Sequence, residues 1–247
     1  MTMAISVNNL TKQYGAFYAV NGLTFDIPQG QIVGLLGGNG AGKTTTISML
    51  VGALLPTSGS INVLGHDMLK KRQHALARMN FSSPYVDLPY RLTVREILTI
   101  FSHFYNVPKY KTRITELAEE LSLTALLGRH YGGLSAGQKT RVSLAKSLIN
   151  SPDVLLLDEP TASLDPDTAD WVRSYLLRYQ EQSKATILLA SHNMQEVERM
   201  CHDTIVMKSG TIAARGLPAD LVRQYGRDNL EEVFLHIARN DIENEVV

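Results

Sequence analysis

The stretch GGNGAGKT, residues 37–44, is the part of the sequence that decides the fold. It fits the pattern G-x-x-x-x-G-K-[ST], in which glycines let the backbone curl so that successive N–H groups point at phosphate oxygens. We expect Lys43 to reach the β- and γ-phosphates of a nucleotide and Thr44 to offer its hydroxyl to Mg²⁺. The candidate nucleotide contacts of this phosphate loop are Gly37, Asn39, Gly40, Ala41, Gly42, Lys43, Thr44 and Thr45.

The residues around the phosphate loop supply the strand and the helix that the pattern requires. The apolar run QIVGLLG, residues 31–37, predicts a buried strand. A helix is expected to begin near Lys43 and to end before the turn signals of residues 54–59. The positive end of its dipole would then face the phosphates. Upstream, residues 4–10 and 23–28 mix β-branched and polar residues, which predicts half-buried strands.

A second apolar run ends in two acids. Residues 154–157 predict a buried strand, and Asp158 and Glu159 follow at its carboxyl end, where open α/β sheets place ligands. We expect Asp158 to hold Mg²⁺ and Glu159 to orient or deprotonate a water. A solvated turn after a core strand would also explain the two acids, but not their occurrence together with a phosphate loop.

His192 comes directly after a further predicted strand, residues 185–191. A lone histidine is usually a surface residue or a satisfied core residue. Its place at the carboxyl end of a central strand favours a contact with the γ-phosphate or the attacking water. The candidate catalytic residues are therefore Lys43, Glu159 and His192.

The stretch LSAGQK, residues 134–139, raises a separate question. Ser135 and Gln138 have the spacing of a capping box before a helix with apolar period. Gly137 in the first turn lowers helix propensity by about 1 kcal/mol relative to Ala, so a purely structural cap explains it poorly. A glycine at this place permits close approach of the backbone to an anion. We call residues 134–139 the signature turn.

The sequence pattern changes from strand-like to helical between residues 84 and 131. Thr93 and Glu96 form a possible capping box there, and the apolar residues that follow have helical period, which predicts a helical insertion. After residue 131 the strand-like pattern returns, and residues 204–216 predict a hairpin. The tail from Pro218 is expected to be helical.

Composition narrows the class of protein. Acidic and basic residues balance at 24 each, so the charge gives no sign of a nucleic-acid partner. The single cysteine, Cys201, excludes a disulfide framework and favours a reducing compartment. The N-terminus lacks the pattern of a secretory signal, and no window supplies about twenty mostly apolar residues. We expect a soluble protein whose membrane role depends on a partner.

Together, GGNGAGKT, LSAGQ, LLLDEP, SLD and SH occur in the order in which the ATP-binding subunits of ABC transporters carry them, and the sequence resembles that family over almost its whole length. The resemblance implies an α/β fold: a P-loop NTPase (RecA-like) core with an antiparallel β subdomain and an inserted helical signature subdomain. It also implies one domain over residues 1–247, made of the core with its β subdomain (1–82 and 140–216), the helical subdomain (83–139) and a short helical tail (217–247).

In that family two subunits stack head to tail, and the signature turn of one closes over ATP held by the other. By this resemblance Ser135, Gly137 and Gln138 face a nucleotide bound by a second copy. Tyr14 matches the aromatic residue that stacks on adenine, with Tyr18 as the rival candidate. Asp165 matches the loop that signals between paired sites, although the same residues would also serve as a helix cap.

The sequence departs from the family pattern at two places. Gly38 stands where a proline is common, which should loosen the loop but keep its donors. A glutamine that contacts Mg²⁺ is usual where the core meets the helical insertion, and this chain has Ser83, or as a second candidate Ser82, near that place. A serine is shorter and could meet the metal through a water. Our hypothesis is that Ser83 is a weaker substitute.

The resemblance implies an ATP- and Mg²⁺-dependent hydrolase, most like the bacterial exporter ATPases whose permease is a separate chain. The expected partners are an integral membrane permease and a second copy or a paralogue, with no nucleic acid, and the expected location is the cytoplasmic face of the inner membrane. The alternatives are an importer ATPase and a soluble ABC ATPase without a permease. The aromatic residues expected near the permease are Tyr85, Tyr90, Phe101, Phe104 and Tyr105.

Overall fold

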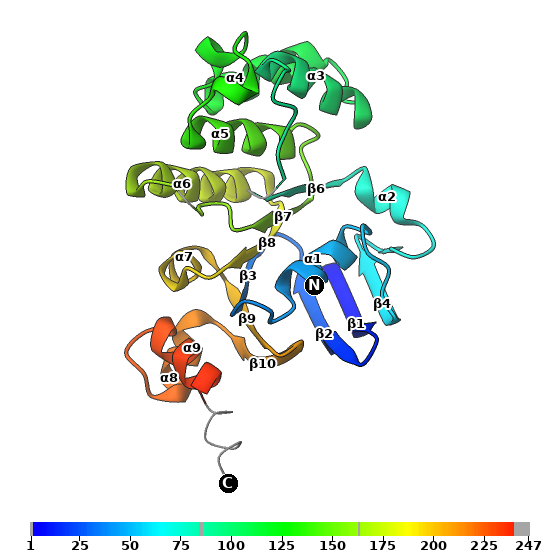
Figure 1. Ribbon diagram of the computed structural model, residues 1–247, viewed down its shortest axis with the longest axis vertical. Helices are drawn as coiled ribbons and strands as arrows, with labels where there is room; N and C mark the ends of the chain where they lie inside the picture. The colour runs from blue at the N-terminus through cyan, green and yellow to red at the C-terminus, as the bar shows by residue number, and fades with distance from the viewer. Residues whose placement is uncertain (1, 84–85, 163, 240–247) are drawn as a thin grey trace.

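The computed structural model describes residues 2–83, 86–162 and 164–239. A six-stranded sheet forms its centre (Figure 1). The strand order is β10-β9-β3-β8-β7-β6, and all neighbours are parallel except the hairpin of β9 and β10. The strands span Ile32–Gly37 (β3), Met79–Ser82 (β6), Val154–Asp158 (β7), Thr186–Ser191 (β8), Asp203–Lys208 (β9) and Thr211–Gly216 (β10).

A smaller antiparallel sheet lies beside the central one, with strand order β2-β1-β4-β5 (Figure 1). It begins with two long strands that pair through several register shifts, which bend and twist the hairpin. Its strands span Met3–Tyr14 (β1), Phe17–Pro28 (β2), Ser58–Val63 (β4) and His66–Asp67 (β5).

Helices cover the central sheet and extend beyond it. Three of them, α3, α4 and α5, gather at one end of the molecule, whereas α8 and α9 lie at the other end (Figure 1). The helices span Lys43–Leu50 (α1), Arg72–Leu76 (α2), Val94–Phe104 (α3), Tyr110–Glu120 (α4), Ala136–Ser147 (α5), Pro166–Ser183 (α6), Met194–Met200 (α7), Pro218–Tyr225 (α8) and Leu230–Arg239 (α9), with short 3₁₀ turns at Thr124–Leu126 (η1) and Tyr131–Gly133 (η2).

Three apolar clusters hold these elements together. One joins the inner faces of α3, α4, α5 and α6 to one face of the central sheet, through residues such as Leu155 and Leu189. A second fills the space between the two sheets and includes α1. The third fixes α8 and α9 against β9 and α7, with Leu36 and Val233 fully buried. The central strands β3, β7 and β8 are buried along their entire length, as expected for a sheet covered on both faces.

The structure confirms the α/β fold class and several local predictions. Thr93 and Glu96 form a complete capping box at the start of α3. Residues 204–216 form the predicted hairpin, β9 and β10. The sequence analysis did not predict β6, because a four-residue strand of mixed polarity has no recognisable period.

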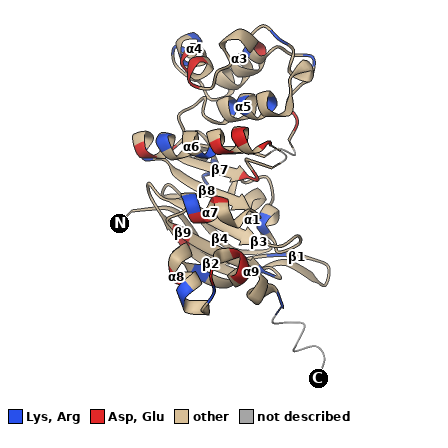
Figure 2. Cartoon of the chain, turned by 90° about the vertical axis from the view of Figure 1, so that its left-hand side faces the viewer, with Lys and Arg blue, Asp and Glu red and all other residues tan. Residues whose placement is uncertain are grey.

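Two further features bear on the expected partners. Among the described residues, no helix is both long enough and apolar enough to cross a bilayer. In the view of Figure 2, α6 carries both basic and acidic residues, whereas the coloured residues of α5 are all basic.

Candidate functional site

The phosphate loop connects the buried strand β3 to α1. Its backbone needs glycine at two positions for steric reasons. A Cβ at Gly37 would stand 2.8 Å from the Met207 carbonyl oxygen. Gly42, the N-cap of α1, has φ +101°, and a Cβ there would stand 2.5 Å from the Ala19 carbonyl oxygen. The loop is therefore folded tightly against β9 and β2, with its N–H groups available at the start of the helix.

Lys43 lies within this loop. Its Nζ donates hydrogen bonds to the carbonyl oxygens of Gly37 at 2.6 Å and Gly38 at 3.3 Å. Burial lowers the pKa of Lys43, and the negative charges of Glu159 and Asp158 oppose that effect. The ammonium group thus faces both acids.

Asp158 ends β7 and is 4% exposed. Burial raises its pKa, as does the charge of Glu159, while Lys43 and a hydrogen bond from Ser83 lower it. The Ser83 hydroxyl donates to Asp158 Oδ2 at 3.5 Å, and Ser83 itself is 5% exposed. The expected metal ligands Asp158 and Ser83 are therefore adjacent, although Ser83 comes from the end of β6.

Glu159 follows Asp158 and has φ +53°, a conformation that is uncommon for a residue with a Cβ. Its N–H donates to the Ala190 carbonyl oxygen at 2.8 Å, which ties the end of β7 to β8. Its Oε2 lies 2.7 Å from His192 Nδ1. The Glu159 side chain is 11% exposed and that of His192 is 70% exposed, so the pair reaches from the interior to the surface.

The sheet order explains why these residues meet. β3, β8, β7 and β6 are consecutive parallel neighbours, so their carboxyl ends lie along one edge. The phosphate loop follows β3, and His192 follows β8. Asp158 is the last residue of β7 and Glu159 comes next, while Ser83 follows β6. Chain order separates these residues widely, and the topology places them side by side.

The charge pattern at this edge fits a magnesium nucleotide. Within the described ranges, no group of three or more His, Cys, Asp or Glu side chains could hold a metal ion alone. Mg²⁺ is usually held by one or two carboxylates, waters and substrate phosphates together. Asp158 at the end of β7, together with the exposed Thr44 in the first turn of α1, therefore suits a metal shared with phosphate oxygens.

Tyr14 ends β1, in the hairpin whose strand β2 packs against the phosphate loop at Ala19 and Val20. Lys12 pairs directly with Val20, and a Cβ at Gly42 would stand 3.3 Å from Val20 Cγ2. Tyr14 shares the face of Lys12, whose Nζ lies 5.1 Å from the Tyr14 ring centre.

The partner of Tyr14 in the hairpin is Phe17, which is 64% exposed and which the sequence analysis did not single out. Directly paired residues share a face, so Phe17 joins Tyr14. Tyr18 pairs with Gln13, but the register shifts between the Lys12 and Gln13 pairs, so the alternation of side chains alone does not assign Tyr18 to either face. Tyr14 and Phe17 form an exposed aromatic pair at the end of the hairpin.

The signature turn does not join this edge. Ser135 and Gln138 form the predicted capping box at the start of α5, and Ser135 is exposed. In Figure 1, α5 lies with the helices at the far end from the β1–β2 hairpin. A Cβ at Gly137 would stand 3.3 Å from Thr168 Cγ2 on α6, which gives this glycine a packing reason that the sequence did not reveal.

Asp165 is the N-cap of α6, and its side chain accepts a hydrogen bond from the Thr168 N–H at 3.0 Å. That hydrogen bond lowers the pKa of Asp165. This hydrogen bond is the helix cap that the sequence offered as an alternative role for Asp165. Ser163, two residues earlier, lies outside the described residues.

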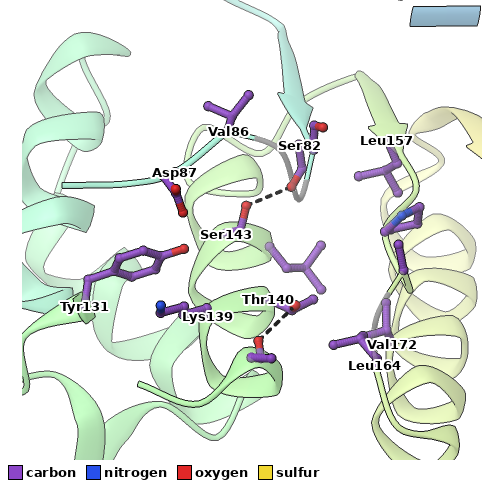
Figure 3. A pocket seen from close by; sticks show the side chains of 15 residues that line it. Ser82, Val86, Asp87, Tyr131, Lys139, Thr140, Ser143, Leu157, Leu164 and Val172 are labelled. Atoms are coloured by element: carbon purple, nitrogen blue, oxygen red, sulfur yellow. Dashed lines mark hydrogen bonds between the residues drawn. The ribbon is translucent and has the colours of Figure 1, made fainter. Parts of the chain in front are cut away.

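A cavity of about 250 Å³ separates α5 from the turn that follows β7 (Figure 3). Its wall on the side of the sheet and α6 is apolar and includes Leu157, Leu164 and Val172. On the opposite side the Ser82 and Ser143 hydroxyls are 2.9 Å apart. Helix α5 is therefore hydrogen-bonded to the end of β6 but leaves open space toward the turn after Glu159.

Comparison with known proteins identifies the family. Residues 20–162 match the family model described as ABC transporter. The chain belongs to the ABC transporter family. The matched segment contains the phosphate loop, the signature turn and the acids of β7, whereas Tyr14 and His192 lie outside it. As a member, the protein is an ATP-binding subunit and an ABC-type ATPase.

Curated relatives of this ABC protein include the Nod factor export ATP-binding protein I of Burkholderia orbicola, 38% identical over 92% of this chain and 75% of the relative. The protein of the same name from Ralstonia nicotianae is 38% identical over 93% and 72%. A solved structure named as the ATP-binding subunit of an ABC transporter is 28% identical, with a TM-score of 0.84 over 96% of this chain and all of that one.

Proposed function

We propose that this protein hydrolyses MgATP in a head-to-tail pair of two copies and thereby drives export through a separate membrane permease. Membership of the ABC family supports the ATPase, and the relatives named Nod factor export ATP-binding protein I support export. The proposed location is the cytoplasmic face of the membrane that holds the permease.

The residues at the carboxyl edge of the sheet divide the work of hydrolysis. Lys43 and the loop N–H groups bind the β- and γ-phosphates. Thr44 and Asp158 hold Mg²⁺, which when bound neutralises charge on the phosphate oxygens. Glu159 accepts a proton from, or orients, the attacking water, and His192 holds Glu159 and reaches the γ-phosphate.

One observation carries the head-to-tail arrangement. The phosphate loop, Asp158, Glu159 and His192 share one edge of the sheet, yet Ser135 is exposed at the start of α5, and the side-chain hydrogen bonds described for Ser135 are those of its own helix cap. A helix N-terminus with a serine cap and Gly137 suits an anion. Since it does not face the nucleotide of its own chain, the nucleotide of a second copy is its proposed ligand.

The sharpest test mixes two inactive variants. Lys43→Ala removes the phosphate contact, and Ser135→Asp keeps a good helix cap while placing a negative charge against the triphosphate. In a head-to-tail pair, a mixed dimer has one site with both lesions and one site with none. An equimolar mixture should therefore regain about a quarter of the wild-type sites, because about half of the random dimers are mixed.

The control is Ser135→Asn, which caps equally well without the charge and should retain more activity than Ser135→Asp. Restored ATPase activity in the mixture supports the composite site. A mixture as inactive as each variant alone, while both variants still fold and Ser135→Asp still binds ATP, would show that each site is built within one chain.

The surface proposed to meet the permease comprises Val86 at the cavity of Figure 3, Tyr90 before α3, and Phe104 at the end of α3. Val86 is 55%, Tyr90 49% and Phe104 72% exposed, which leaves apolar area for a cytosolic helix of a membrane protein. Phe101 and Tyr105 instead pack against the apolar cluster of this region. Tyr85, also expected here, lies outside the described residues.

Phe104→Asp should release the protein from membranes without lowering its basal ATPase activity, because this side chain lies on the surface far from the catalytic edge. Fractionation of membranes followed by purification of the associated integral protein measures this. Purification with ribosomes or nucleic acid, and not with an integral protein, would instead support the soluble class of ABC ATPase.

A further inference from the structure

A buried acid outside the residues assigned to catalysis connects the turns that carry Glu159 and His192. Glu196, in α7, is 1% exposed. Its Oε1 accepts a hydrogen bond from the Thr161 hydroxyl at 2.9 Å, and its Oε2 accepts one from the Ser191 hydroxyl at 2.7 Å. Thr161 stands two residues after Glu159, and Ser191 stands immediately before His192.

These contacts close a ring around the Glu159–His192 pair. On one side, the Glu159 N–H is bonded to Ala190 of β8. On the other, Glu196 holds Thr161, which follows Glu159, and Ser191, which precedes His192, through its two oxygens. The 2.7 Å contact between Glu159 and His192 lies between these two ties. The turn of Glu159 is thus tied to β8 and to α7, and the residue directly before His192 is tied to α7.

The ring requires a side chain that can bond two hydroxyl groups at once. A carboxylate presents two oxygens to two hydroxyl donors, which matches Thr161 and Ser191. Ser191 in turn accepts from the Asn193 N–H at 3.0 Å, so its hydroxyl is held from both directions. A buried charge costs free energy unless it is well bonded, and helix packing alone would be served by an apolar residue. The free-energy cost of burying the Glu196 carboxyl group therefore indicates a role other than helix packing.

We propose that Glu196 is a positioning residue that sets the separation of Glu159 and His192 by tying together the two turns that carry them. This inference rests on the proposed function, in which Glu159 and His192 act on the attacking water and the γ-phosphate. Glu196 touches neither group. It acts by keeping their contact short, and a misplacement of about 1 Å at a reacting group can lower a rate about a hundredfold.

The test compares Glu196→Ala with Glu196→Gln in steady-state ATP hydrolysis. Alanine removes both ties, and kcat should fall about tenfold to a hundredfold while KM for ATP stays within about twofold, since the phosphate loop is untouched. Glutamine has the same shape and can still bond both hydroxyls, so it should retain kcat within about threefold. Glu181→Gln, at an exposed position of α6, is the matched control and should be unchanged.

If Glu196→Ala does not fold, Thr161→Val and Ser191→Ala each remove one tie with little change of volume, and each should lower kcat about threefold or more. Equal kcat in folded Glu196→Ala and the Glu181 control would overturn the proposal. A Gln variant as slow as the Ala variant, or a loss seen only in KM, would do the same.

Glu159→Gln, measured in parallel, separates this inference from the function on which it rests. If Glu159→Gln remains active, the assigned role of Glu159 fails. If Glu159→Gln is inactive but every Glu196 variant is normal, only the positioning role of Glu196 fails.

Discussion

Replacing Glu159 by Gln isolates the charge that the proposed mechanism needs. The side chain is 11% exposed and its Oε2 lies 2.7 Å from His192 Nδ1. Glutamine has the same volume and can turn its amide oxygen toward the histidine, so the contact and the φ of +53° need not change. What disappears is the negative charge and the ability to accept a proton.

The size of the effect follows from that difference. General base catalysis contributes about 10²- to 10⁴-fold to a rate, and each tenfold change corresponds to about 1.4 kcal/mol of activation free energy. We expect kcat to fall by that factor, which is about 3–5 kcal/mol. ATP binding should persist or become tighter, because one of the two acids beside Lys43 no longer repels the phosphates.

The assay is steady-state phosphate release at saturating MgATP, with ATP binding measured separately. His192→Ala should cost less than Glu159→Gln, and the double variant should be no slower than Glu159→Gln, since the two residues act as one unit. A Glu159→Gln variant that hydrolyses ATP within about threefold of the wild-type rate would refute the assignment of Glu159 as base.

Three other predictions concern nucleotide, metal and stability. Ala at Tyr14 or Phe17 should weaken ATP binding about 5- to 150-fold in a fluorescent-nucleotide titration, because about 1–3 kcal/mol of stacking is lost. Tyr18→Ala should leave ATP binding unchanged. The reverse order would exclude Tyr14 as the adenine contact. Ser83→Ala should raise the Mg²⁺ concentration needed for half-maximal activity about tenfold, and Ser82→Ala should not; equal Mg²⁺ dependence of all three proteins would contradict a metal role for Ser83. Burial lowers the pKa of Lys146 from 10.5 to about 8, so the unfolded chain binds this proton more tightly than the native state does. Below about pH 8 the native protein therefore bears the full free-energy cost of burying the charged ammonium group. The free energy of urea unfolding of the wild type, relative to Lys146→Met, should rise between about pH 8 and about pH 10, and a constant difference would show that Lys146 does not titrate there.

Much of the site could be predicted from the sequence because its parts are local. The phosphate loop is contiguous, and its glycines, lysine and threonine occupy fixed offsets that imply their own geometry. Asp158, Glu159 and His192 each follow an apolar run, and the end of such a run indicates the carboxyl end of a buried strand. The capping boxes of Thr93 and Ser135 are also local, since they depend on a spacing of three residues.

Other features depend on contacts between distant segments. The sequence placed Ser83 near the metal only by resemblance, because its position next to Asp158 requires β6 to pair with β7 across more than seventy residues. Phe17 was missed because the face that it shares with Tyr14 depends on the register of the hairpin, which contains shifts. Gly137 lies against α6 for a reason that only packing shows.

The sequence by itself determined the class of fold and the chemistry of the phosphate loop, because hydrophobic period and short motifs act over a few residues. Only the tertiary structure decided that Glu196 reaches both Thr161 and Ser191, since an ordinary glutamate in a helix carries no sign of its partners. The order of parallel strands brings those turns together, and strand order is set by long-range packing rather than by any local pattern.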